Sequence, residues 1–124
     1  LGIIPTGRIS SAYGYAQALN GTWDWYKKNT RNYNASRANF KDVTDFIGWY
    51  SNQSLKMLGI SKKDYYNQYL AYHEGQGGWN KKTFESKEWL IDVAKRVETN
   101  AKKYNSQLLN CEKDLNKKGI FGIF

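Results

Sequence analysis

The 124-residue sequence is long enough for one domain with its own hydrophobic core, because domains usually contain about 100–150 residues. Hydrophobic residues make up 40% and charged residues 24%, a balance that excludes a wholly disordered chain. The net charge of +8 is spread evenly, since residues 1–80 carry nine basic and five acidic side chains and residues 81–124 carry ten and six. No apolar run approaches the length of about 18 residues that a transmembrane helix needs.

Helix breakers are sparse, with one proline and eleven glycines, and this favours a mainly α-helical fold. In chain order, we expect a loop over 1–14, a helix over 15–28, a polar loop over 29–38, a helix over 40–58, a helix after 61 that ends before 75, a Gly-rich loop over 74–82 and a last helix over 86–109. Asn39 and Ser61 are the expected N-caps of the two middle helices. The last helix should bury one face, formed by Trp89, Leu90, Val93, Val97 and Tyr104.

The first informative stretch is the small-residue loop that leads through Gly14 to Gln17. We expect Gln17 in the first turn of a helix, where its amide could both donate and accept hydrogen bonds to a sugar hydroxyl or N-acetyl group. The alternative is an ordinary solvated helix residue. Tyr13 and Tyr15 flank Gly14 and, with Trp79 further along, could stack on sugar rings.

The second stretch is Tyr72-His73-Glu74 followed by Gly75, at the expected end of a helix. All three side chains are capable of site chemistry, but each also has a plain structural interpretation. Tyr72 would then be a core aromatic residue, His73 a structural histidine and Glu74 a surface carboxylate. The glycines that follow lack the Lys-Ser/Thr of a phosphate-binding loop. The single Cys111 excludes an internal disulfide and a CxxC metal site.

Together, the two stretches resemble the lysozyme-like lytic transglycosylase family, the soluble-lytic-transglycosylase (SLT) domains. That family has a Gly-Leu-Met-Gln signature that enters a helix, and Gly14-Tyr15-Ala16-Gln17 stands in its place, with Thr22 five residues later. It also has a helix ending in Ala-Tyr-Asn-Ala-Gly, which Ala71-Tyr72-His73-Glu74-Gly75 matches with His for Asn and Glu for Ala. The resemblance covers about residues 10–100 and is greatest for one divergent bacterial branch.

The resemblance implies that residues 1–124 are one lysozyme-like domain, of which this chain is the C-terminal portion without its first helix or helices. The family's single catalytic glutamate lies about twenty or more residues before the Gly-x-x-Gln. Only thirteen residues precede Gly14, and the first acidic residue is Asp24. We therefore expect the catalytic glutamate upstream of this chain, and the 124 residues alone to be inactive. Glu74 is the one candidate in this chain to replace that glutamate. A general acid needs a raised pKa, and this would require the Glu74 carboxyl to be partly buried.

The function implied is a peptidoglycan lytic transglycosylase, which cleaves the β-1,4 bond between N-acetylmuramic acid and N-acetylglucosamine and leaves a 1,6-anhydro product. The expected substrate-binding residues are Gln17, Tyr72, Tyr13, Tyr15, His73, Glu74 and Trp79. No cofactor is implied. The partners would be peptidoglycan strands in the bacterial periplasm or cell envelope and the missing N-terminal segment, with a monomeric chain. A non-catalytic glycan-binding module is the alternative. Fifteen lysines against four arginines, evenly spread, argue against nucleic acid.

Overall fold

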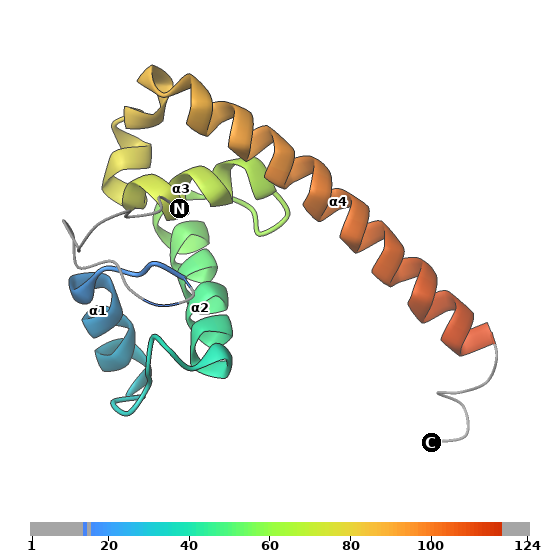
Figure 1. Ribbon diagram of the computed structural model, residues 1–124, viewed down its shortest axis with the longest axis horizontal. Helices are drawn as coiled ribbons and strands as arrows, with labels where there is room; N and C mark the ends of the chain where they lie inside the picture. Colours follow the sequence, from blue (N-terminus) through green and yellow to red (C-terminus); the bar gives the residue numbers. More distant parts are fainter. Residues whose placement is uncertain (1–13, 15, 118–124) are drawn as a thin grey trace. The chain divides into compact units, whose positions relative to one another are not determined.

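The computed structural model describes residue 14 and residues 16–117, and the chain divides into two compact units, Leu1–Lys62 and Lys63–Phe124 (Figure 1). The first unit contains α1 (Asn20–Thr30) and α2 (Phe40–Leu58). The second contains α3 (Tyr65–Asn80), a 3₁₀ turn η1 (Thr83–Ser86) and α4 (Glu88–Lys117). The mainly α-helical fold is thereby confirmed. None of the described helices is long and apolar enough to cross a membrane.

The core of the first unit is aromatic and lies between α1 and α2. Trp23 and Tyr26 from α1 meet Phe46 from α2, with ring centroids 5.0 and 5.4 Å from the Phe46 ring, and all three side chains are buried. Tilted and edge-on arrangements of this kind favour aromatic pairs beyond the area that they bury. The two helices are therefore held together by their rings and also by a polar contact, in which the Tyr26 hydroxyl donates to Asp45 Oδ2 at 2.6 Å.

The predicted boundaries of α2 are confirmed. The Oδ1 atom of Asn39 accepts a hydrogen bond from the backbone N–H of Asp42 at 3.0 Å, which satisfies one of the free donors of the first turn. At the other end Gly59 adopts a positive φ of 71° and donates its N–H to the carbonyl of Leu55. A residue with a Cβ would adopt this left-handed conformation only with strain, which explains why the helix ends at a glycine.

The predicted start of α1 at residue 15 is wrong, because the helix begins at Asn20. Residues before it form a turn in which the N–H of Gln17 donates to the carbonyl of Gly14 at 3.3 Å. The side chain of Gln17 donates to the same carbonyl, so a local turn competes with the helix here. At its C-terminus α1 runs past Lys28 to Thr30 and ends where Arg31 becomes left-handed.

The second unit is built around α3, and its first turn differs from the prediction. Asp64, not Ser61, caps α3, and its Oδ1 atom accepts from the backbone N–H of Asn67 at 3.1 Å. The expected Gly-rich loop over 74–82 is also wrong, because the chain stays helical to Asn80. Only Gly75 departs from helical geometry, with φ 79° and ψ 160°, and there it kinks the helix.

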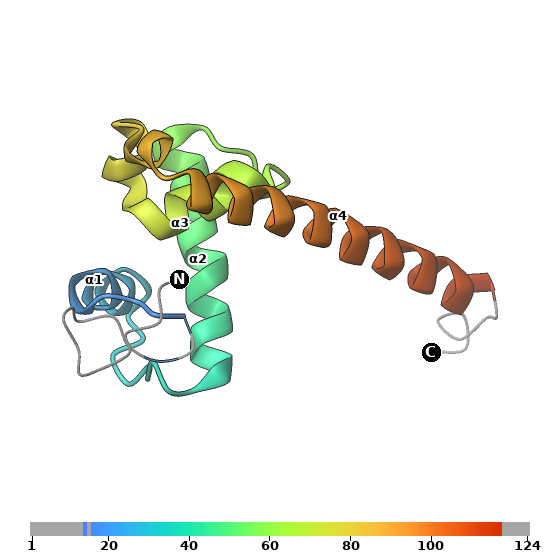
Figure 2. The same ribbon diagram turned by 45° about the horizontal axis from the view of Figure 1, so that its top comes forward.

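The helix α4 begins at Glu88 and extends to Lys117, eight residues beyond the expected end. Leu90 is buried against Leu70 of α3, as predicted, and Ala94, which was not part of the prediction, is buried with it. Val93 and Val97 are half-buried, but Trp89 is 56% and Tyr104 is 64% exposed, so the prediction of burial is wrong for these two residues. Tyr104 lies further along α4 than the buried residues, and Figures 1 and 2 show that this helix continues beyond the part that α3 covers.

Candidate functional site

The turn that carries the first motif is held by glycine geometry. Gly14 has a positive φ of 79°, and a Cβ at this position would overlap the backbone carbonyl of Arg37. Two properties of glycine are therefore needed at once, the left-handed conformation and the absence of a side chain. Arg37 in turn donates from Nη1 to the carbonyl of Ala18 at 2.8 Å, so the loop before α2 is fastened to the motif. The sequence analysis did not identify Arg37.

Gln17 lies in this turn and not in the first turn of a helix, as had been expected. It adopts a φ of 51°, which a non-glycine residue adopts at a cost of about 1 kcal/mol or more. Its Nε2 atom donates to the carbonyl of Gly14 at 2.9 Å. The Oε1 atom has no hydrogen-bond donor among the described residues, so the amide presents an acceptor of fixed orientation.

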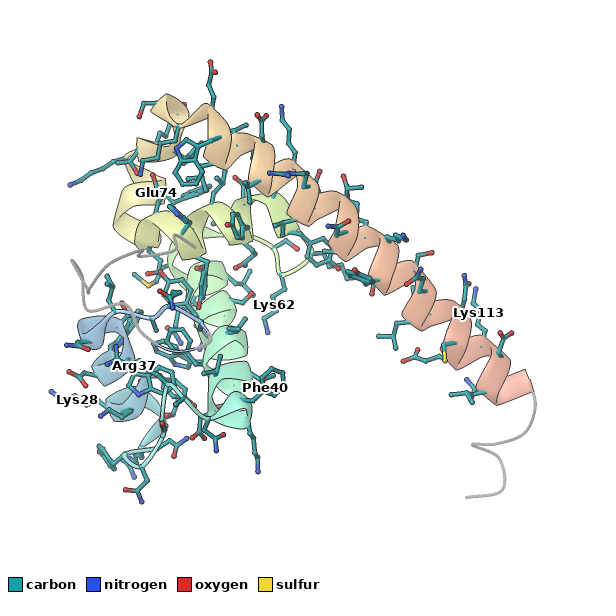
Figure 3. All side chains as sticks on the ribbon, in the orientation of Figure 1. Lys28, Arg37, Phe40, Lys62, Glu74 and Lys113 are labelled. Atoms are coloured by element: carbon teal, nitrogen blue, oxygen red, sulfur yellow. The ribbon has the colours of Figure 1, made fainter. Side chains whose placement is uncertain are left out.

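The second motif lies at the kink of α3. Tyr72 is half-buried in the turn before Gly75, and Glu74 directly precedes that glycine. The Glu74 side chain is only 5% exposed, so its interpretation as a surface carboxylate is wrong. In Figure 3 it lies where α3 faces the beginning of α4. A buried carboxylate needs partners, and these come from both sides of the kink.

Glu74 accepts hydrogen bonds from three side chains. Lys87 Nζ donates to both carboxylate oxygens at 2.9 Å, and Thr83 Oγ1 donates to Oε1 at 2.8 Å. The Nδ1 atom of His73 lies 3.0 Å from Oε2. The network joins α3 to η1 and to Lys87, the residue between η1 and α4, and it therefore holds the chain on both sides of the kink at Gly75. Lys87, which completes the network, was not identified from the sequence because nothing in its local pattern distinguishes it from the other lysines.

The electrostatics of Glu74 follow from these contacts. Burial raises the pKa of its carboxyl, but the hydrogen bonds from Lys87, Thr83 and His73 and the charge of Lys87 together hold the pKa below its usual value. The group is therefore ionised at neutral pH. A general acid for glycosidic cleavage needs the opposite shift, toward a protonated carboxyl. The geometry thus favours Glu74 as a structural anion and disfavours it as the proton donor.

Of the three aromatic residues expected to stack on sugar rings, the structure describes only Trp79. The Trp79 ring packs against the Leu70 and Leu90 core, and its Nε1 atom donates to Asn67 Oδ1 at 3.1 Å. Its stacking on a sugar stays a prediction. Tyr13 and Tyr15 lie outside the described residues. No cluster of three or more potential metal ligands occurs among the residues that the structure describes.

The family profile described as "Transglycosylase SLT domain" matches residues 1–111. The chain belongs to this family. No curated protein and no solved structure matches it significantly. As an SLT domain, the chain has the mainly α, lysozyme-like architecture that its helices display, and the family acts on peptidoglycan by cleaving glycan strands.

Membership of the SLT family relates the two motifs to one another, although they lie in different units. Gln17 belongs to the first unit and Tyr72 to the second. In the resemblance both motifs line one groove, and their approach in a common cleft stays a prediction. Each motif is by itself a rigid element, because a glycine with a φ of 79° shapes it and side-chain hydrogen bonds hold it in place.

Proposed function

We propose that this chain is the cleft-forming part of a peptidoglycan lytic transglycosylase. Its reaction is cleavage of the β-1,4 bond between N-acetylmuramic acid and N-acetylglucosamine, with a 1,6-anhydro sugar as product. The observation that carries the proposal is the family match over residues 1–111, in which both motifs fall in the expected order. The shape of each motif supports it, since both place a polar side chain next to a fixed turn.

In this proposal Gln17 holds the glycan through Oε1, to which none of the described residues donates a hydrogen bond. Tyr72 positions the catalytic carboxyl by a hydrogen bond from its hydroxyl. Tyr13, Tyr15 and Trp79 contribute apolar ring surface to sugar residues. Glu74 and His73 keep the second motif in place, because Glu74 accepts hydrogen bonds from Lys87 and Thr83.

The reaction requires one carboxyl, which first protonates the glycosidic oxygen and then, as a base, removes the proton of the C6 hydroxyl group. That hydroxyl attacks C1 of the same sugar, so the anhydro ring forms without water, and the scheme differs from hydrolysis by two carboxylates. Glu74 is unsuited to this role because its pKa is lowered and Lys87 occupies both of its oxygens. We propose that the carboxyl comes from residues upstream of this sequence.

Such an enzyme would work as a monomer in the periplasm or cell envelope of a bacterium. The net charge of +8 is consistent with a substrate that carries carboxylates on its lactyl groups and peptide stems. The upstream segment would be the partner that completes the site. No metal or organic cofactor takes part in the scheme.

The decisive experiment compares purified peptidoglycan incubated with the 124-residue chain and with a version extended upstream. We expect anhydro-muropeptides, detected by mass spectrometry, from the extended protein alone. General acid catalysis is worth about 10²–10⁴-fold, so its loss makes the short chain inactive on the time scale of the assay. Activity of the short chain that Glu74→Gln abolishes would contradict the assignment and make Glu74 the acid.

A non-catalytic glycan-binding module is the second candidate. The observation that favours it is the ion pair at Glu74, since the described residues then offer binding groups without a poised acid. The same experiment separates the two candidates. Retained glycan binding without cleavage by either version would support the binding module.

A further inference from the structure

The second unit exposes a tryptophan beside the buried carboxylate of Glu74. Trp89 stands in the first turn of α4 and is 56% exposed, although tryptophan is among the side chains that gain most from burial. The His73 ring meets the Trp89 ring edge-on, with the centroids 5.5 Å apart and the planes at 78°. Neither motif of the sequence includes Trp89.

His73 is held in a defined orientation. Its ring also lies 6.4 Å from the Tyr69 ring, and its Nδ1 atom is 3.0 Å from Glu74 Oε2. Glu74 is in turn fixed by Lys87, which donates to both of its oxygens. The histidine thus has packing on two sides and a polar anchor on a third, and its position is set before any ligand arrives.

The anchor also determines what His73 can offer to a ligand. An ionised carboxylate only accepts hydrogen bonds, so the Nδ1 atom of His73 carries the hydrogen that Glu74 binds. In the neutral imidazole the Nε2 atom is then an acceptor. No hydrogen bond joins Nε2 to another of the described residues, and the side chain is 15% exposed.

We propose that Trp89 and His73 form a sugar subsite, in which the indole ring stacks on the apolar face of an N-acetylhexosamine and His73 Nε2 accepts a hydrogen bond from that sugar. The proposal rests on the proposed function, from which the glycan substrate comes. An exposed aromatic face beside a preorganised polar group is the composition of small-ligand sites, where apolar surface supplies affinity and a few polar groups fix orientation. Glu74 and Lys87 are positioning residues here, because they act on the sugar only through His73.

The test is a titration of the isotope-labelled chain with the β-1,4-linked tetrasaccharide of N-acetylglucosamine, followed by NMR. This probe is uncharged, so non-specific attraction by the lysines does not contribute. We expect chemical-shift changes at the Trp89 indole N–H and at the His73 ring. Trp89→Ala should weaken binding about tenfold, since stacking of aromatic rings is worth up to about 1.5 kcal/mol.

Tyr104→Ala is the matched control, because Tyr104 is an aromatic residue on the same helix and is 64% exposed. It should leave the dissociation constant unchanged within about twofold. His73→Phe keeps a ring of similar shape and removes the acceptor, and we expect about fivefold weaker binding from a chain whose helical circular dichroism is unchanged. A second readout for the histidine is its ring resonances in the unsubstituted chain, which should shift with the same dissociation constant.

Equal effects of Trp89→Ala and Tyr104→Ala would overturn the subsite, as would saturable shifts confined to residues outside it. In both cases the extended protein could still release anhydro-muropeptides, and the proposed function would stand. If the tetrasaccharide does not bind at all, the subsite is wrong. Only the further absence of anhydro products from the extended protein would then contradict the proposed function as well.

Discussion

Lys87→Ala tests whether the Glu74 network stabilises the second unit. The substitution removes two charge-assisted hydrogen bonds from the Glu74 carboxylate, whose side chain is 5% exposed. Thr83 and His73 then remain as its side-chain partners. Breaking a buried ion pair costs about 3–5 kcal/mol, and exposed pairs are worth about 0.2–1 kcal/mol. Lys87 is itself 37% exposed, so water partly replaces it, and we expect a loss of about 2 kcal/mol.

The measurement is urea unfolding of the two proteins, followed by helical circular dichroism. For a domain of this size a loss of about 2 kcal/mol also lowers the melting temperature by about 8 °C. The matched control is Lys102→Ala, which removes the partner of Glu98 on α4, an ion pair of 3.7 Å whose lysine is 65% exposed. That change should cost less than about 0.5 kcal/mol.

The reasoning fails if the two lysine substitutions cost the same. A double-mutant cycle with Glu74→Gln gives a stricter test, because it isolates the interaction between the two side chains. We expect a coupling free energy of about 2 kcal/mol, well above the 0.3–0.5 kcal/mol or so within which independent sites add. Additive losses would show that Glu74 and Lys87 do not act on one another in solution.

Three further predictions concern a turn, the ionisation of Glu74 and a helix cap. Gly14→Ala should lower the free energy of unfolding by about 2 kcal/mol or more, because the new side chain combines a positive φ with overlap on the Arg37 carbonyl. Gly21→Ala is the control: this glycine is in a helix with open space at its Cβ, and the change should raise the free energy of unfolding by up to about 1 kcal/mol. Equal melting temperatures of the two variants would contradict the prediction. Because the Glu74 pKa is lowered in the folded protein, its contribution is present above its ordinary value of 4.5 and is lost as the pH falls through the folded value. Acid titration of stability should therefore be steeper below about pH 4.5 for the parent chain than for Glu74→Gln. Asp64→Ala should cost about 1 kcal/mol in denaturant unfolding through loss of the α3 cap, and an unchanged midpoint would show that the cap is dispensable.

Local signals predicted α2 to the residue and failed where two signals competed. At α2 the Asn39 cap, the apolar period and Gly59 all indicate the same helix, and the structure has it. At residues 61–64 both Ser61 and Asp64 are good caps, and the choice between them depends on the helix that follows. Gly75 was interpreted as a helix end, but the chain is helical on both sides of it, where Thr83 of η1 and Lys87 bind Glu74 by hydrogen bonds.

The site was predicted less well than the fold because its partners are distant in sequence. Glu74 meets Lys87 across 13 residues, and Gly14 meets Arg37 across 23, and no periodicity connects such pairs. A helix cap or a helix face is determined by residues that are close in sequence, whereas these contacts form only after the elements have packed. The predicted burial of Tyr104 was wrong for the same reason, since the apolar period of α4 continues past the part that α3 covers.

The two motifs share one physical design. In each motif a glycine with φ 79° bends the backbone next to a hydrogen-bonded polar side chain: Gln17 donates to the Gly14 carbonyl, and Glu74 accepts from Lys87 and Thr83. These hydrogen bonds use both carboxylate oxygens of Glu74 but only the Nε2 atom of the Gln17 amide. In the proposed function, the groups that meet the glycan are the Oε1 atom of Gln17 and the Nε2 atom of His73, each on a side chain that one of these hydrogen bonds holds. A carboxylate that already accepts from Lys87, Thr83 and His73 is held ionised, which is why the proposed reaction takes its proton from a different carboxyl.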